Sequence, residues 1–363
     1  MRIAIDATAL LLRSAGIKSV LYHWLQALQA LAGSDAVVAY PPMPELGGLD
    51  QEGSVADRWP TLRGIVMAVA NQRLGLPFPQ WCTRGADVFH SSNQVRTPPR
   101  GMKLTATIHD MTCWKMPELH TAANVAADWR YAKMVLTRAD GLIAVSEHSR
   151  RDALEVLGLA PERIVAIPNG VSEEYFRAVP KLRAKPYVLH VGTIEPRKNI
   201  DRLLDAWAMM RPELRAEYEL IVAGPAGWAS GPTVARLQSA PESVRWLGYV
   251  AEKDLPSLTA GASVLAYPSL YEGFGLPLAE AMASGVACVT SNVSSMPEVA
   301  GEGARLVDPL SVSELSGALS GLLENPEERA RLGHAGHARA AALYRWPLVA
   351  ERSLEFFRRV IGS

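Results

Sequence analysis

The sequence predicts an α/β protein built from two parallel-sheet domains. Its 363 residues exceed the usual size of one domain and suit two domains of about 150 to 180 residues. Short apolar, strand-like blocks alternate with helical patterns in both halves, which is typical of parallel sheets. In the first half, polar residues follow these blocks at the position where open α/β sheets bind ligands.

Composition and charge exclude several classes of protein. A hydrophobic content of 48% and a mean hydropathy of +0.04 predict a globular protein with a large core. The 37 Lys and Arg residues balance 37 Asp and Glu residues without a basic cluster, so no nucleic-acid partner is expected. Three widely spaced cysteines, Cys82, Cys113 and Cys288, predict a reducing compartment and no zinc site. Without a signal peptide or a long apolar run, the protein is expected to be cytoplasmic, and a peripheral contact with a membrane stays open.

The first half opens as strand, loop and helix. Residues 2–6 predict a strand, and apolar residues at helical spacing predict a helix over 17–31. Gly16 stands at the start of this helix, where it either approaches a phosphate or only forms the turn. A Pro- and Gly-rich surface loop is expected over 41–60. The other expected strands of this half are 87–91, 104–110, 141–145 and 163–167.

The second half repeats the alternation after an expected linker at 171–185. A helix is expected over 200–210, helical structure from 309 onward, and a last helix over 349–361. Strands are expected at 187–191, 219–222, 244–247, 263–267 and 286–290.

The stretch 269–285 predicts the main ligand site. A Gly-rich loop follows the strand at 263–267 and leads into a helix with Pro277 in its first turn and Gly285 at its end. Backbone N–H groups and the positive end of a helix then face the carboxyl edge of the sheet, which favours an anion. Glu272 and Glu280 bracket this loop and can accept hydrogen bonds from hydroxyls. Amides for phosphate and carboxylates for hydroxyls together suit a sugar nucleotide.

Three further residues are candidates for chemistry. Arg197 and Lys198 lie between a strand and a helix; alone they indicate a solvated pair, but beside the main site they favour diphosphate binding. His109 follows a buried strand and either contacts the sugar or acceptor or is a satisfied core histidine. The chain contains no G-x-G-x-x-G, Walker A, H-E-x-x-H or Asp-x-Asp element. Stabilisation of a leaving group by cations and helix dipoles, with no metal and no cofactor, is therefore expected.

Several motifs make the chain resemble the retaining glycosyltransferases of family 4, over nearly its whole length. The resemblance is closest to the subgroup of bacterial O-antigen and polysaccharide mannosyltransferases, whose donor would be GDP-mannose. The motifs are Glu272-x7-Glu280 with SNVSSMPEVAG at 291–301, GTIEPRKN at 192–199, LGYV at 247–250, TIHD at 107–110, VSEHS at 145–149 and IPNGV at 167–171.

The resemblance implies a GT-B fold, in which two Rossmann-like domains face each other across a cleft. The implied domains are an acceptor domain at 1–172, a nucleotide-sugar donor domain at 173–345 and a last helix, 346–363, crossing back to the first domain. It also implies roles for single residues. Glu272 would bind the donor sugar, Glu280 the ribose, Arg197 and Lys198 the diphosphate, Phe274, Gly275 and Leu276 the phosphates and sugar through amides, Tyr249 and Val250 the base, His109 the transferred sugar, and Gly16 the phosphate.

The first loop departs from the subgroup pattern. Relatives commonly read T-G-I-G-R-Y, whereas this chain reads SAGIKS at 14–19, with Lys18 in place of a glycine and Ser19 in place of an arginine. Many relatives also carry an arginine at the position of Thr193. In this chain Arg197 could take the role of that arginine.

These observations predict a retaining, metal-independent hexosyltransferase. It would move a hexose, with mannose favoured, from a nucleoside diphosphate sugar to a hydroxyl of a glycan or lipid-linked glycan. The alternatives are a GT-B epimerase or hydrolase, a degenerate nucleotide-sugar-binding subunit, and a dinucleotide-dependent oxidoreductase, which the missing glycine fingerprint disfavours.

Overall fold

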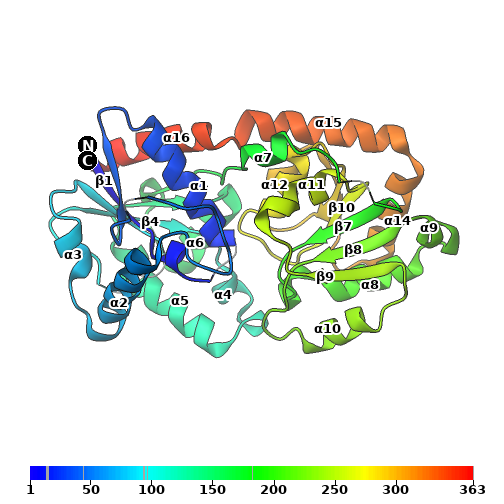
Figure 1. The fold of residues 1–363 in the computed structure, drawn as a ribbon, viewed down its shortest axis with the longest axis horizontal. Helices are drawn as coiled ribbons and strands as arrows, with labels where there is room; N and C mark the ends of the chain where they lie inside the picture. The colour runs from blue at the N-terminus through cyan, green and yellow to red at the C-terminus, as the bar shows by residue number, and fades with distance from the viewer. Residues whose placement is uncertain (14–15, 44, 93–94, 96, 182, 363) are drawn as a thin grey trace. The chain divides into compact units, whose positions relative to one another are not determined.

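The computed structural model describes the chain except for residues 14–15, 44, 93–94, 96, 182 and 363 (Figure 1). The chain divides into two compact units. The first comprises Met1–Pro117, Ala122–Gly170 and Trp346–Ser363, and the second comprises Glu118–Thr121 and Val171–Arg345. Each unit is built on its own parallel sheet flanked by helices.

The sheet of the first unit has the order β2-β1-β3-β4-β5-β6, and all its pairings are parallel. Because β1 has β2 on one side and β3 on the other, the order reverses beside β1, and ligands of such sheets bind at this point. The strands are β1 (Arg2–Asp6), β2 (Ala36–Tyr40), β3 (Val88–Ser91), β4 (Lys103–Ile108), β5 (Gly141–Ala144) and β6 (Ile164–Ala166).

The sheet of the second unit has the order β12-β11-β10-β7-β8-β9 and is also parallel throughout. Its order reverses between β7 and β10, so the loops after these two strands meet at the carboxyl edge. The strands are β7 (Tyr187–Val191), β8 (Glu219–Ala223), β9 (Val244–Gly248), β10 (Val264–Tyr267), β11 (Cys288–Ser291) and β12 (Ala304–Val307).

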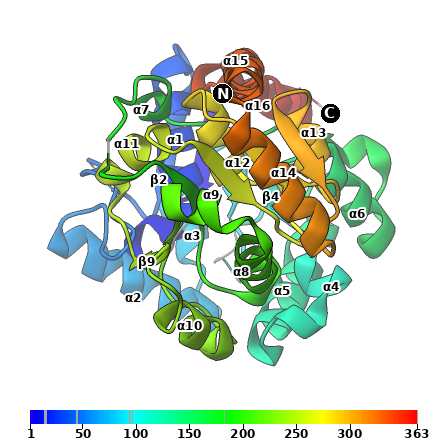
Figure 2. The ribbon, with the colours of Figure 1, turned by 90° about the vertical axis from the view of Figure 1, so that its right-hand side faces the viewer.

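In the second unit, α8 and α14 lie side by side and share one core with the sheet (Figure 2). Trp207 of α8 is fully buried there, and its Nε1 donates to Ser243 Oγ at 3.2 Å. The helical segments of this unit are α7 (Glu173–Phe176), η5 (Pro196–Lys198), α8 (Ile200–Met209), α9 (Pro212–Glu217), α10 (Gly231–Gln238), η6 (Glu252–Asp254), α11 (Leu255–Ala260), α12 (Leu276–Ala283), α13 (Met296–Ala300), α14 (Val312–Glu324) and α15 (Pro326–Leu343).

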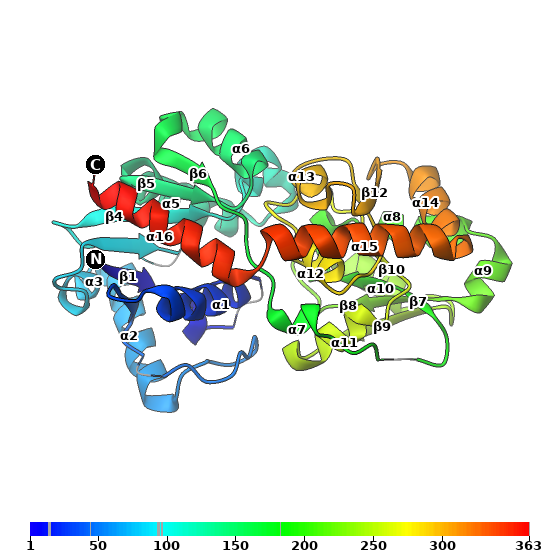
Figure 3. The same cartoon turned by 90° about the horizontal axis from the view of Figure 1, so that it is seen from above.

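In the first unit, α1 and α16 lie side by side (Figure 3). Trp24 of α1 donates from Nε1 to Ser353 Oγ of α16 at 3.0 Å and packs edge-on against His90 of β3. Phe89, the residue before His90 on β3, points to the opposite face of the sheet and belongs to the hydrophobic core there, because successive side chains of a strand alternate between the two faces. The helical segments are η1 (Thr8–Leu11), α1 (Gly16–Leu31), α2 (Arg58–Leu74), α3 (Phe78–Cys82), α4 (Thr112–Lys115), η2 (Pro117–Leu119), α5 (Ala122–Met134), η3 (Leu136–Arg138), α6 (Glu147–Leu157), η4 (Pro161–Arg163) and α16 (Trp346–Gly362).

The fold class was confirmed, and a few expected elements were wrong in detail. The segment 171–185 is not only a linker, because Ser172 caps the short helix α7 and Val171 pairs with Arg345. Strands β2 and β12, and helices α2 and α3, fall where the sequence analysis expected no regular element. Among the described residues, no helix combines the length and apolarity needed to span a membrane.

Candidate functional site

The candidate site of the second unit lies where its sheet order reverses. The segment η5 follows β7 and carries Arg197 and Lys198, while the loop after β10 carries Glu272. The two loops are joined through their backbones, because Leu270 N donates to Arg197 O at 2.8 Å. Residues that are 74 or more positions apart in the sequence are thus brought together at one sheet edge.

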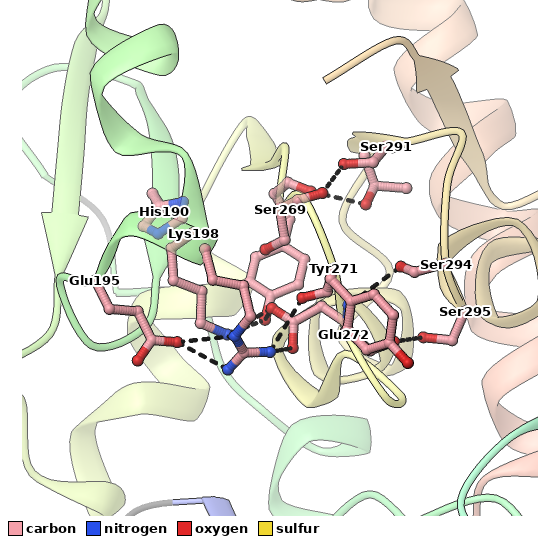
Figure 4. Close-up of polar contacts among 12 residues, drawn as sticks. His190, Glu195, Lys198, Ser269, Tyr271, Glu272, Ser291, Ser294 and Ser295 are labelled. Atoms are coloured by element: carbon pink, nitrogen blue, oxygen red, sulfur yellow. Dashed lines mark hydrogen bonds and ion pairs between the residues drawn. The ribbon is translucent and has the colours of Figure 1, made fainter. Parts of the chain in front are cut away.

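Glu272 is the centre of this cluster (Figure 4). Its Oε1 accepts hydrogen bonds from Lys198 Nζ at 2.6 Å and from the hydroxyl of Tyr267 at 2.8 Å. Its Oε2 accepts from Arg197 Nη1 at 2.7 Å. The carboxylate is buried, with 5% of the residue exposed, so both cations are held against it in a protected environment.

The cations decide the ionisation of Glu272. Burial by itself would raise the pKa of this carboxyl, but the charges of Arg197 and Lys198 and the hydrogen bonds outweigh burial and hold the pKa at about 2. Glu272 is therefore ionised at physiological pH and acts only as a hydrogen-bond acceptor.

A second layer fixes the two cations. Glu195 Oε1 accepts from Arg197 Nε at 3.1 Å and Nη2 at 2.8 Å, so the guanidinium is clamped between two carboxylates. Lys198 Nζ also donates to the hydroxyl of Tyr267 at 2.7 Å. Tyr267 in turn stacks on the buried ring of His190, at 5.9 Å between ring centroids. The geometry of the cluster is thus set before any ligand arrives.

The backbone of Glu272 is pinned by two serines that follow β11. Glu272 N donates to Ser294 Oγ at 3.2 Å, and Ser295 Oγ donates to Glu272 O at 2.9 Å (Figure 4). These bonds explain why the SNVSSMPE stretch belongs to the site, although its own carboxylate, Glu298, lies in the first turn of α13.

The start of α12 requires a glycine at position 275. Gly275 has φ +87°, and a Cβ there would lie 2.4 Å from Met296 Cε. The neighbouring Phe274 is buried against Tyr344, with ring centroids 5.3 Å apart. The turn leads to Leu276 at the start of the helix. Pro277 has no N–H, and Leu278 N and Ala279 N both donate to Gly275 O, at 3.0 and 3.2 Å, so the Leu276 amide is the donor of this turn that can face an anion.

Glu280 lies in a different environment from Glu272. It is on α12, near Tyr175 of α7 and Glu252 of η6. Burial, and then the charge of Glu252, raises the pKa of Glu280 to about 8. The two carboxylates of the motif are therefore ionised to different extents at neutral pH, a contrast that the spacing alone did not predict.

This raised pKa predicts a pH-dependent stability. Between its reference value of 4.5 and about 8, Glu280 holds a proton in the folded chain that the unfolded chain releases, so its contribution to stability falls as pH rises. Urea unfolding between about pH 5 and pH 8 should show the wild type losing stability relative to Glu280→Gln. Glu217→Gln, at an exposed position, should leave the curve unchanged. Parallel curves for wild type and Glu280→Gln would contradict this assignment.

The other predicted donor-site residues lie at the same carboxyl edge. Thr193 follows β7, and Tyr249 and Val250 follow β9, all half-buried. Gly224, at the end of β8, lets the chain approach Gly192 closely, since a Cβ there would lie 1.9 Å from the Gly192 carbonyl oxygen. These positions fit the implied roles, which themselves stay predictions.

Gly16 and His109 belong to the first unit. Gly16 is the first residue of α1, and His109 directly follows β4. His109 lines a cavity of about 30 Å³ together with Trp24 and His90. Burial lowers the pKa of His109 to about 4, so the ring is neutral at physiological pH. The contact of His109 with the transferred sugar stays a prediction.

The structure explains the atypical Lys18. Its side chain is fully buried, and Nζ donates to the carbonyls of Leu12, at 2.9 Å, and Gly53. Lys18 thus ties the loop before α2 to the first turn of α1 and serves as a structural crosslink. Ser14 and Ala15 of the same loop lie outside the described residues.

Replacing Lys18 by methionine tests this role. Two carbonyls would lose a charged donor, so we expect the free energy of unfolding to fall by roughly 1–3 kcal/mol. Urea unfolding measures this change. Lys133→Met, at an exposed position on α5, is the matched control. Equal midpoints for Lys18→Met and wild type would contradict the crosslink.

Several site residues were missed by the sequence analysis. Tyr267 ends the strand expected at 263–267, and nothing in that apolar run marks its hydroxyl as part of a site. Glu195 lies within GTIEPRKN, and Ser294 and Ser295 lie within SNVSSMPEVAG, but none of the three was given a role of its own. A usable signal was their position. Tyr267 ends β10 and Glu195 follows β7, the two strands at the reversal point, and Ser294 and Ser295 follow the neighbouring strand β11.

Two six-stranded parallel sheets in separate units are the architecture of the GT-B fold, and the carboxylate–cation cluster lies at the reversal point of the second sheet. The chain belongs to the glycosyltransferases that have this fold. Residues 14–175 match Glycosyltransferase Family 4, and residues 171–339 match Glycosyl transferases group 1. The recognition from sequence is thereby confirmed, including the mannosyltransferase-like subgroup.

Curated relatives support this membership. The chain is 34% identical over 297 residues to the MMP α-(1→4)-mannosyltransferase of Mycolicibacterium hassiacum, covering 76% of this chain and 71% of the relative. It is 35% identical over 241 residues to the O-antigen chain mannosyltransferase B of Escherichia coli, an alignment that spans 63% of each chain and so less than two thirds of that relative. The solved sucrose-phosphate synthase of Thermosynechococcus elongatus shares the fold, with a TM-score of 0.75 at 20% identity, covering 100% of this chain and 99% of that chain.

Proposed function

We propose that the protein is a retaining hexosyltransferase, with mannose the first sugar to test. It takes the hexose from a nucleoside diphosphate sugar and passes it to a hydroxyl of a glycan or lipid-linked glycan. The observation that carries the proposal is the buried cluster of Glu272, Arg197 and Lys198 at the point where the sheet order reverses.

The cluster has the donors that a diphosphate needs. Among the described residues, the Lys198 ammonium donates to two oxygens, those of Tyr267 and Glu272, so one of its three N–H groups is left for a ligand. The Leu276 amide at the start of α12 adds a neutral donor at the same edge. Glu272, ionised and held in place, accepts hydrogen bonds from the hydroxyls of the donor sugar.

The proposed reaction exchanges one bond to the anomeric carbon for another. The bond between this carbon and the diphosphate oxygen breaks, and a bond to the acceptor oxygen forms on the same face. The acceptor proton passes to the leaving diphosphate, whose negative charge Arg197 and Lys198 stabilise. No side-chain nucleophile and no metal is needed for this scheme, and the neutral His109 would contact the transferred sugar.

The sugar and acceptor are proposed from the relatives. Two of them are named as mannosyltransferases, one of them for an O-antigen chain. We therefore place GDP-mannose first among donors and a mannoside first among acceptors. The remaining alternatives are separated by the same assay, because an epimerase or a hydrolase makes a different product and a non-catalytic subunit makes none.

The test is a transfer assay with GDP-mannose and methyl α-mannoside, with and without EDTA, repeated with UDP-, ADP- and dTDP-sugars. Release of nucleoside diphosphate that depends on acceptor, is unaffected by EDTA and gives an α-linked product by proton NMR is the expected result. Equal release without acceptor would indicate a hydrolase, an isomerised donor an epimerase, and no turnover of any donor would contradict the proposal.

A further inference from the structure

The first unit presents an exposed tryptophan that is one member of a pair. Between positions 82 and 178, Trp129 of α5 is the one large hydrophobic side chain that is exposed among the described residues, at 53%. Its ring packs against that of Trp114 on α4, with ring centroids 5.7 Å apart and an angle of 54° between the ring planes. Trp114 is only half-buried itself, so the two indoles form a small aromatic platform at the surface.

Small side chains surround Trp129 on its own helix. Ala122 and Ala126 precede it at steps of four and three residues, so they share its face of α5, and both are exposed. Neither side chain extends beyond its Cβ, so the indole stays uncovered. A platform of this size is far smaller than the apolar surfaces by which proteins bind one another. It matches the area of a single ring.

A short, anchored helix carries Trp114. Thr112 N donates to Asp110 Oδ1 at 3.0 Å, and Trp114 N donates to Met111 O at 3.0 Å. Met111 and Thr112 are fully buried. Trp114 is therefore held five residues beyond His109, the residue proposed to contact the transferred sugar.

The packing of α5 brings Trp129 to the same edge of the sheet. Helices α4 and α5 contact each other (Figure 1). The hydroxyl of Tyr131 donates to Ser91 O at 3.2 Å, and Ser91 ends β3, the neighbour of β4. Tyr131 and Trp129 are two residues apart, so they lie on opposite sides of the helix. One side of α5 is thus fixed at the carboxyl edge, and the other side presents the indole.

An indole at this position suits a sugar ring. A pyranose has a face of C–H groups and a rim of hydroxyls, so it can cover an apolar ring while its hydroxyls stay in water. The indole supplies a large contact area and an N–H donor. Among the described residues, Trp129 Nε1 has no hydrogen-bond partner, so it can donate to an oxygen of the sugar.

We propose that Trp129, supported by Trp114, is an acceptor subsite that stacks on a sugar ring at least one unit away from the position of transfer. The acceptor is then an oligosaccharide chain, and the subsite makes its length matter. The inference rests on the proposed function for the identity of the ligand as a glycan. It goes further by naming the residues that bind the part of this glycan that does not react.

The test compares a short acceptor with a long one. Transfer to methyl α-mannoside and to an α-linked mannotetraose is measured for wild type, Trp129→Ala and Trp129→Phe. Binding of the tetrasaccharides of α-mannose and of α-glucose, without any donor, is measured by isothermal calorimetry. Trp59→Ala is the matched control, because Trp59 is 78% exposed on α2, a different helix of the same unit.

We expect Trp129→Ala to raise the KM for mannotetraose about tenfold, because an aromatic stack is lost. Its kcat, and its KM for methyl α-mannoside, should stay at the wild-type values. Trp129→Phe should recover part of the lost affinity, and Trp59→Ala should match the wild type. Calorimetry should rank the four proteins in the same order for a tetrasaccharide.

The calorimetry keeps this inference separate from the proposed transfer. Binding of neither tetrasaccharide by the wild type, or equal binding by Trp129→Ala, would overturn the subsite whether or not transfer occurs. An equal rise of KM for both acceptors would also overturn it, since Trp129 would then act at the position of transfer. Binding that Trp129→Ala loses, without turnover of any donor, would support the subsite and contradict the proposed function. A dimer in sedimentation velocity that Trp129→Ala abolishes would overturn the proposal by assigning the indole to a second copy.

Discussion

Replacing Lys198 by methionine is expected to lower turnover by about 100- to 1,000-fold while the fold is kept. Lys198 supplies a buried positive charge, held by Tyr267 and Glu272, at the place proposed for the leaving diphosphate. Methionine keeps most of the side-chain volume beside the Tyr267 ring but removes the charge. Steady-state kinetics with GDP-mannose, together with a thermal melt of the variant, measures both quantities.

The matched control is Lys185→Met. Lys185 precedes β7, whereas Lys198 follows it, so the two lysines lie at opposite ends of the same strand. The ammonium of Lys185 is exposed and donates to Ala216 O at 2.9 Å. Turnover of this variant should stay close to that of the wild type. If Lys198→Met turned over as fast as Lys185→Met, Lys198 would have no part in the reaction.

Replacing Glu272 by alanine is expected to lower the free energy of unfolding by about 3–5 kcal/mol, because two buried cations then lose their shared carboxylate. The wild-type contribution depends on pH. Since the folded pKa of Glu272 is about 2 and its reference value is 4.5, this contribution is present above about 4.5 and is lost as pH falls toward 2. Urea unfolding near neutral pH measures the difference between variant and wild type.

A double variant separates the ion pair from simple loss of packing. Glu272→Ala/Lys198→Met removes one of the stranded cations, so it should be less destabilised than the sum of the two single variants. Glu217→Ala, at an exposed position, should change stability by less than about 0.5 kcal/mol. Additive effects in the double variant, or a loss of less than about 1 kcal/mol in Glu272→Ala, would contradict the account of a buried ion cluster.

The sequence predicted the site where its residues follow strand ends. Arg197, Lys198 and Glu272 each come shortly after a strand, and the parallel sheet then brings them to one edge. Tyr267 could not be placed in this way, because a tyrosine at the end of an apolar strand serves a core equally well. The closeness of Glu252 to Glu280 depends on the packing of α12 against α7 and α11, which no local pattern shows.

The first unit contains the less predictable features. Lys18 stood out as a departure from the family pattern, but its burial against two loop carbonyls depends on a loop some 35 residues away. Helix α2 has apolar residues on its exposed face as well as on its core-facing side. Its sequence therefore lacks the one-sided pattern that marks a surface helix. Only the structure shows which of these apolar residues are exposed to solvent.

The measurement that tests the central claim most directly is thermal unfolding with GDP, UDP, dTDP, ADP and NAD, each with magnesium and with EDTA, for wild type and Lys198→Met. A ligand at about 100 times its dissociation constant adds roughly 2.7 kcal/mol, which raises the melting temperature by several degrees. The donor-site account predicts that one nucleoside diphosphate raises the melting temperature of the wild type, with or without EDTA, and has a much smaller effect on Lys198→Met. No response to any nucleoside diphosphate, a response to NAD alone, or an equal response in the variant would contradict a donor site built around Glu272, Arg197 and Lys198.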